Sequence, residues 1–254
     1  MPRPNGAVIW QGVSVLDGVT PISVVVTGLN SRSANGKTGD MLQTWIILRD
    51  LHPSEAVESG ADSGICGDCK HRKQHDGSRS CYVRMNAPTS VWWKLQRTLG
   101  RWTPKPGLKY AVTSDLREIA ALGAGREVRL GSYGDPAAVP IVVWQALVSR
   151  ATGRTGYTHQ ARRAPSLMAL AMASADTVLE AFEYQEAGWR TFRVAAPGDG
   201  ERARGEARCP ASVESGRVAT CETCPLKCDG AAGGLLNIVI QAHGNGKNHV
   251  KRAA

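Results

Sequence analysis

Seven cysteines lie in two short stretches of this 254-residue chain, and their spacing indicates chemistry more clearly than any other feature. The first cysteine loop (residues 60–86) has the pattern C-x2-C-x11-C and contains Cys66, Cys69 and Cys81. The second cysteine loop (residues 205–233) has the pattern C-x11-C-x2-C-x3-C and contains Cys209, Cys221, Cys224 and Cys228. In a reducing cytosol, closely spaced thiols bind metal more often than they form disulfides. Both loops are therefore candidate metal sites.

The two loops differ in the number of ligands they supply. Three thiolates leave one coordination position that is open or filled by His71 or His75. Zinc with three Cys and one His is one interpretation, and a [4Fe–4S] cluster with one free iron is the other. Four thiolates close a shell, so the second loop predicts structural zinc or a fully ligated cluster. An arrangement in which both loops share one binuclear site stays open.

Charge and composition indicate the partner and the compartment. The chain has 31 Lys and Arg against 22 Asp and Glu, a net charge of +9. Such an excess attracts the phosphates of a polyanion, so we expect nucleic acid, DNA in particular, or a nucleotide as partner. No run of about 18 apolar residues and no signal peptide is found, so we expect a cytoplasmic protein without a membrane partner. Five basic residues crowd into the first cysteine loop: Lys70, Arg72, Lys73, Arg79 and Arg84.

Strands alternate with helices along most of the chain. Residues 22–29 and 41–50 are predicted to form a hairpin of two paired strands or a strand on either side of a functional loop. A helix that Thr89 or Ser90 caps follows the first cysteine loop. Alternation of this kind predicts parallel β-α units. We therefore expect one α/β domain over residues 1–254, a partial TIM-barrel-like parallel sheet with the two cysteine loops as insertions. Further strands are predicted at 125–136, 153–160, 166–174, 189–195 and 236–244, and helices at 137–153 and 175–188.

Polar residues follow the ends of the predicted strands, and in a parallel sheet this edge is where sites are built. Asp135 and His159 are the candidate catalytic residues, Asp135 as a base or an ammonium acceptor and His159 as a proton donor or phosphate clamp. Gly131 and Gly134 allow a ligand to approach the backbone closely. With Asp135 and Ser174 they are the candidate cofactor contacts.

Helix capping is the alternative role for several of these polar residues. Asp135 followed by Pro136 is an ordinary start of a helix. Ser174 and Asp176 can cap the helix predicted after them in the same way. His159 has the alternative role of a solvated loop histidine.

The motifs resemble, in their order, those of a group of poorly characterised phage- and plasmid-borne proteins. The likeness rests on "CYV" at 81–83, "VRLGSYGDP" at 128–136 and "GYTHQ" at 156–160, followed by a cysteine-rich end. The likeness covers about residues 30–244 and implies no particular activity. It implies a phage-encoded protein of the host cytoplasm.

A more distant resemblance is to the radical S-adenosylmethionine enzymes. These are partial α/β barrels whose first βα loop holds three cluster cysteines and whose next strand ends in a GGE-like motif near the methionine amine. The first cysteine loop, with Tyr82 beside its last cysteine, matches the former, and Gly134 with Asp135 matches the latter. The spacing here is C-x2-C-x11-C in place of C-x3-C-x2-C, and YGD replaces GGE. The resemblance implies a [4Fe–4S] cluster, S-adenosylmethionine as cofactor and an auxiliary cluster in the second cysteine loop.

The chain also resembles the tRNA-guanine transglycosylases and their phage DNA-modifying relatives, which combine a barrel, a catalytic aspartate and a structural zinc. Asp135 is the nucleophile that this likeness implies. The function we expect first is a metal-dependent, radical S-adenosylmethionine-like enzyme that acts on nucleic acid or a nucleotide. The alternatives are a zinc-stabilised nucleic-acid-binding protein without catalysis and a transglycosylase-like enzyme that modifies DNA bases.

Overall fold

Apolar, β-branched runs build one mixed sheet. The computed structural model describes residues 4–31, 35–101, 109–199, 202–203, 205–216, 218–230, 236–244 and 246–250. Within these residues the strands follow the order β4-β1-β2-β3-β5-β6-β7-β8-β10-β9. Positions 217 and 231–233 of the second cysteine loop lie outside the described residues. In the described part of the chain, no helix has the length and apolar character that a membrane crossing requires.

The N-terminal part of the sheet is antiparallel. β1 (Gly6–Val13) pairs with β2 (Pro21–Thr27), and β2 pairs with β3 (Leu42–Leu48). The predicted hairpin is thereby confirmed. β1 was not predicted, because Gly6, Gln11 and Gly12 interrupt its apolar pattern.

The rest of the sheet is parallel, and its strands follow chain order from β3 to β8, after which β10 precedes β9. The short strand β9 (Glu206–Arg208) pairs with β10 at one end of the sheet, and β4 (Ala111–Val112) pairs with β1 at the other. The predicted parallel α/β architecture is confirmed. Because β4 and β9 each have a single neighbour, the sheet is open and is not a closed barrel. The strands of this part after β3 are β5 (Glu127–Tyr133), β6 (Gly153–Thr158), β7 (Met172–Ala175), β8 (Thr191–Ala195) and β10 (Asn237–Gln241).

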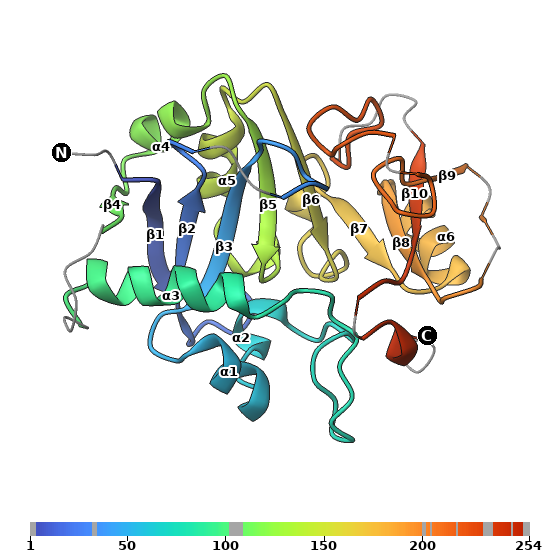
Figure 1. The fold of residues 1–254 in the computed structure, drawn as a ribbon, viewed down its shortest axis with the longest axis horizontal. Helices are drawn as coiled ribbons and strands as arrows, with labels where there is room; N and C mark the ends of the chain where they lie inside the picture. The colour runs from blue at the N-terminus through green and yellow to red at the C-terminus, as the bar shows by residue number, and fades with distance from the viewer. Residues whose placement is uncertain are drawn as a thin grey trace.

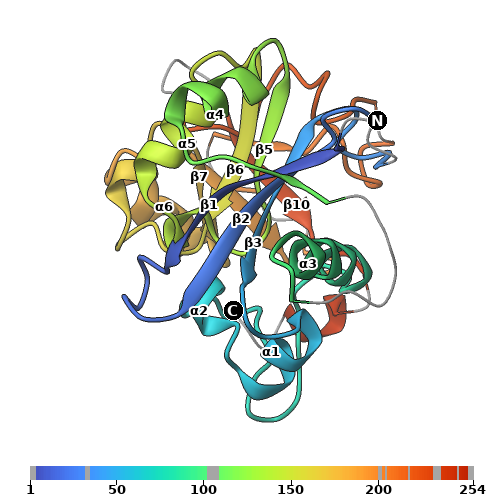
Figure 2. The ribbon, with the colours of Figure 1, turned by 90° about the vertical axis from the view of Figure 1, so that its left-hand side faces the viewer.

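Helices cover both faces of the sheet (Figure 1). Figure 2 shows α4 (Leu116–Gly123), α5 (Ile141–Val148) and α6 (Val178–Glu186) on one side and α3 (Asn86–Thr98) on the other. The chain between β3 and α3 forms two short helices, α1 (Pro53–Ser59) and α2 (Ser63–Cys66). Single turns of 3-10 helix lie at Pro136–Ala138 (η1), Pro165–Leu167 (η2) and Lys247–His249 (η3).

Two predicted helix boundaries are wrong. α3 begins at Asn86, ahead of the predicted caps Thr89 and Ser90, which lie inside the helix. The helix predicted over 137–153 is divided into η1 and α5, because Pro140 between them lacks the N–H that a continuous helix requires.

The end of β5 lies very close to β3 at Gly134. Its φ of +78° is in the left-handed region, and a Cβ atom placed there would lie 2.7 Å from Cβ of Ile46. Glycine is required here by both conformation and space. The two strand ends can therefore approach closely enough to position the residues that follow β5.

We expect Gly134→Ala to lower the free energy of unfolding by about 2–4 kcal/mol, since it adds a steric clash to backbone strain. The matched control is Gly18→Ala, because Gly18 also has a positive φ, +72°, but has no atom within 4 Å of the added Cβ. The control should lose about 1 kcal/mol. Chemical denaturation measures both, and equal losses in the two variants would contradict the role of the β3 contact.

Candidate functional site

The first cysteine loop lies at the edge where the parallel strands end. In Figure 1 it extends below the sheet, in the direction in which the β5 arrow points. Strand ends hold it in place: the backbone N–H of Asp135, after β5, donates to Ile65 O at 2.7 Å. After β6, Gln160 Nε2 donates to Cys66 O at 3.1 Å and to Asp68 Oδ1 at 2.7 Å. The loop is thus fixed at the edge that the strand pattern predicts for a site.

The thiols of this loop are free, and they lie near one another. Burial raises the pKa of Cys69 to about 12. Burial, together with the charges of Cys69 and Cys81, raises the pKa of Cys66 well above its ordinary value. Thiols in such surroundings stay protonated unless a cation stabilises their thiolates. Three free thiols in one loop are a donor set of the kind that metal ions and metal clusters take.

Neither histidine of the loop completes this donor set. His75 is exposed at the tip of the loop. The two ring nitrogens of His71 contact Ser80 Oγ at 2.7 Å and Asp176 Oδ1 at 2.8 Å. The fourth position that the three-cysteine pattern predicts is therefore not closed by either of these histidines.

Asp176, which follows β7, joins two histidines. Besides the bond with His71, its Oδ1 lies 3.9 Å from His159 Nε2, and its Oδ2 lies 3.7 Å from Lys70 Nζ. Burial acts to raise the pKa of Asp176, but the hydrogen bond from His71 and the charges of His159 and Lys70 outweigh it and hold the pKa below 3.8. The prediction that Asp176 caps α6 is wrong, because Thr177 Oγ1 accepts the hydrogen bond from Glu180 N in that helix.

Asp135 is buried, and three donors surround its carboxylate. Oδ1 accepts from Ala137 N at 2.9 Å and from Thr158 Oγ1 at 2.7 Å, and Oδ2 accepts from His159 N at 2.8 Å. Burial raises the pKa of Asp135 above 3.8, although these bonds act in the opposite direction. Asp135 therefore caps η1, so the alternative prediction of a helix cap before Pro136 is confirmed. It also holds the backbone of His159.

The other candidate cofactor contacts, Gly131 and Ser174, pack within the sheet. Gly131 has a φ of +68°, and an added Cβ would lie 2.8 Å from Gly134 O. Its N–H donates to Thr44 Oγ1 at 2.8 Å, which ties β5 to β3. Ser174 is buried within β7 and is 4 % exposed. None of these residues lines the cavity described next.

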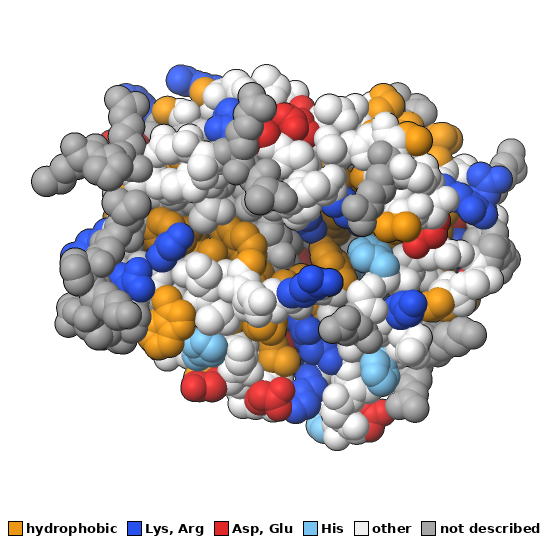
Figure 3. Space-filling view, viewed as in Figure 1, with side chains coloured by type: hydrophobic (Ala, Val, Ile, Leu, Met, Phe, Trp, Pro, Cys, Tyr) orange, Lys and Arg blue, Asp and Glu red, His pale blue; other side chains and the backbone are white. Residues whose placement is uncertain are grey.

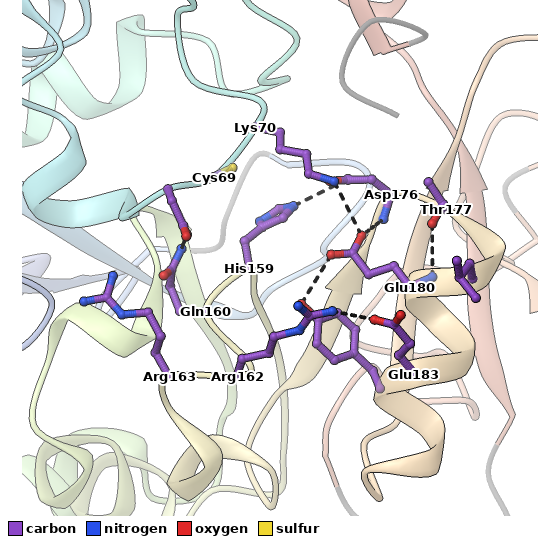
Figure 4. A pocket seen from close by; sticks show the side chains of 13 residues that line it. Cys69, Lys70, His159, Gln160, Arg162, Arg163, Asp176, Thr177, Glu180 and Glu183 are labelled. Carbon is purple, nitrogen blue, oxygen red and sulfur yellow. Dashed lines mark hydrogen bonds and ion pairs between the residues drawn. The ribbon is translucent and has the colours of Figure 1, made fainter.

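A cavity of about 370 Å³ opens beside the first cysteine loop, lined by side chains from that loop, from the segments that follow β6 and β7, and from α6 (Figure 4). Cys69, His159 and Asp176 all lie on its wall. Cations and carboxylates alternate around it, among them Arg162 and Glu183, which pair with each other. The cavity joins the predicted cysteine and histidine residues into one site with charges of both signs.

The second cysteine loop packs at the opposite edge of the sheet, where the parallel strands begin. Its Cys221 N and Glu222 N donate to the carbonyls of Lys37 and Thr38, just before β3, at 2.9 and 3.2 Å. Lys227 Nζ contacts Glu127 Oε1, at the first residue of β5, at 2.9 Å. The loop therefore joins the starting ends of neighbouring strands, as a stabilising element does.

The thiols of the second loop form their own group. Burial raises the pKa of Cys228 to about 12, with the charges of Cys209, Cys221 and Cys224 adding to the effect. Lys37 lies among these thiols: burial lowers its pKa, and the charges of Cys209 and Cys221 oppose that change. The two loops at opposite edges of the sheet favour two separate sites over one shared binuclear site.

Sequence reasoning missed two features of the site, the contact between His71 and Asp176 and the role of Gln160. His71 and Asp176 are 105 positions apart, and no local pattern relates them. The signal for Asp176 was its place after a strand, which it shares with Asp135 and His159. Gln160 belongs to the "GYTHQ" motif, but a buried amide that binds backbone has no distinctive spacing.

We expect Asp135→Ala to lower the free energy of unfolding by about 3 kcal/mol or more, because three buried donors lose their acceptor. Asp17→Ala is the matched control: its carboxylate also accepts three hydrogen bonds, from Val19 N, Thr20 N and Thr20 Oγ1, but in an exposed turn. Water replaces the acceptor there, so the loss should stay near or below about 1 kcal/mol. Denaturation curves that gave similar losses for both variants would refute the importance of Asp135 burial.

Comparison of the chain with protein-family models, with curated proteins and with solved structures finds no match. The function is therefore inferred from the side chains of the site and their surroundings.

Proposed function

We propose that this protein is a metal-dependent enzyme whose first cysteine loop holds an iron–sulfur cluster beside the cavity. One observation carries the proposal: Cys69 belongs to a set of three free thiols and also lines a cavity at the edge where parallel strands end. Sites in parallel α/β sheets are built at this edge. The three cysteines leave a coordination position for a cofactor or substrate, since neither His71 nor His75 closes it.

The number of ligands favours a cluster over a structural zinc ion in the first cysteine loop. A structural zinc ion takes four protein ligands, and neither histidine of the loop completes the set of three cysteines. A [4Fe–4S] cluster can be held by three cysteines with one iron left open.

S-adenosylmethionine is the cofactor that we propose for the cavity. Its methionyl group carries an ammonium and a carboxylate, and the cavity wall offers carboxylates such as Glu180 and Asp68 together with cations such as Lys70 and Arg163. When bound, the cluster supplies an electron and an open iron position to this cofactor. The chain's own residues orient the ligand by charge and keep the cysteine loop fixed to the strand ends.

A nucleic acid or nucleotide is the proposed substrate class. The basic residues of the first cysteine loop, from which the sequence predicted this partner, do not support it, because carboxylates pair with several of them. There Arg72 pairs with Asp62 and Lys73 pairs with Glu58. These basic residues therefore stabilise the loop itself. The face seen in Figure 3 nevertheless gathers Lys and Arg side chains near its middle, around a hollow with hydrophobic side chains.

A basic groove favours the second candidate function, a zinc-stabilised nucleic-acid-binding protein without catalysis. The groove has a volume of about 370 Å³ and lies beside α3. Lys94, Arg97 and Lys109 line it, and the described residues of its lining include no carboxylate. Phosphate contacts of such residues give salt-dependent affinity for nucleic acid. The third candidate, a transglycosylase-like enzyme, has less support, because its nucleophile Asp135 is buried and surrounded by donors.

We expect protein purified without oxygen to contain iron and sulfide, with the visible absorption of an iron–sulfur cluster. Cys69→Ser and Cys81→Ser should each remove the iron of the first site, because three-thiolate ligation is incomplete without them. Cys224→Ser is the control and should leave that iron in place. Metal and sulfide analysis with electron paramagnetic resonance measures the outcome. A colourless protein with two equivalents of zinc would end the cluster proposal.

For the groove, we expect Lys94→Ala and Lys109→Ala each to weaken binding of a DNA oligonucleotide and to reduce the slope of log affinity against log salt by about 0.9 per lost phosphate contact on duplex DNA. Arg117→Ala is the control, since Arg117 is exposed at the start of α4 on the other side of the sheet. Fluorescence anisotropy at several salt concentrations measures the slope. An unchanged slope in both groove variants would exclude the groove as the contact surface.

A further inference from the structure

The cavity wall carries a second set of metal-ligating atoms that does not use the cysteines. One nitrogen each of His71 and His159 and one carboxylate oxygen of Asp176 lie within 4.8 Å of one another. The three residues come from the first cysteine loop, the end of β6 and the end of β7. Two imidazoles and one carboxylate are a common ligand set for divalent transition metals, with further positions left open.

His159 provides an independent sign that a ligand belongs here. Its Nε2 atom is buried and has no hydrogen-bond partner, although Asp176 Oδ1 is 3.9 Å away. A buried nitrogen without a partner is costly, and a missing ion is one of its ordinary explanations. The rings of His71 and His159 meet edge to face with centroids 5.2 Å apart, and the Nε2 atoms of both rings lie near Asp176 Oδ1, at 2.8 and 3.9 Å.

The neighbours of His71 and Asp176 resemble the supporting shell of a metal site. Ser80 Oγ lies 2.7 Å from His71 Nδ1, and a hydroxyl can accept the Nδ1 proton so that Nε2 presents its lone pair. Asp176 is 3 % exposed, and Lys70 approaches its other oxygen, Oδ2, with a side chain that is 50 % exposed. A cation bound to Oδ1 would take the place of the proton in the hydrogen bond between His71 Nε2 and Asp176 Oδ1.

We propose that His71, His159 and Asp176 form a site for one divalent transition-metal ion that uses none of the cysteine thiols. His159 and Asp176 both line the cavity, so the open positions of the ion face a space large enough for a substrate. An oxygen ligand such as a phosphate or a hydroxyl group suits those positions. This site does not depend on an iron–sulfur cluster in the first cysteine loop.

Cobalt distinguishes this site from the cysteines, because thiolate ligands give Co²⁺ an intense sulfur-to-metal charge-transfer band that imidazole and carboxylate ligands do not give. The full-length protein is titrated with Co²⁺, and binding is followed by absorption and calorimetry. We expect His159→Gln and Asp176→Asn each to bind one Co²⁺ fewer per chain or to weaken that binding on the order of 100-fold. The spectrum that is lost should have no thiolate band.

His75→Gln and Glu183→Gln are the matched controls and should bind Co²⁺ as the natural chain does. His75 is an exposed histidine of the same loop, and Glu183 is a carboxylate on the same cavity wall. Equal stoichiometry and affinity in the natural chain and His159→Gln would overturn the proposal. A lost spectrum that carries the thiolate band would also overturn it, because the variant would then have disturbed the cysteines. Absence of iron from the purified protein bears on the cluster alone.

Discussion

The carboxylate of Asp135 is shared by the elements that meet at the candidate site. The side-chain oxygens of Asp135 hold the first turn after β5 and the backbone of His159 after β6, while the backbone N–H of Asp135 donates to Ile65 O in the first cysteine loop. A buried carboxylate is stable only when donors surround it, so these segments have to adopt this arrangement together. The positions of Cys66 and His159 relative to each other follow from that requirement.

The parallel order of the strands determines where the two cysteine loops lie. Loops that follow parallel strands collect at one edge, and there the three-cysteine loop adjoins a cavity and titratable side chains. Loops that precede the strands collect at the other edge, and there the four-cysteine loop contacts the starts of β3 and β5. The loop with three cysteines thus lies beside the cavity, and the loop with four cysteines lies where it joins the starts of strands.

Local patterns predicted the elements that are long and apolar, and they failed where structure depends on distant partners. The runs that became β2, β3 and β5 were recognisable because buried strands are continuously apolar or alternate. The helices α1 and α2 are too short to show a helical period. At the site, Asp135 and His159 were predicted from their places after strands, whereas the contact of His71 with Asp176 joins positions that only the folded sheet brings together. The capping role of Asp135 was predictable from Pro136 beside it, but its hold on His159 was not.

The contacts of the second cysteine loop also constrain the order in which parts of this protein can fold during synthesis. Glu222 binds the backbone N–H of Asp40 across 182 positions of the chain. During synthesis the N-terminal strands leave the ribosome first, and contacts between distant positions form late. The contacts of the second cysteine loop with residues 37–40 can therefore form only after the strands from β3 to β8 have been made. The segment before β3 is without these partners during that time, so the start of the central strand β3 is completed late, although β3 itself is one of the first strands to be made.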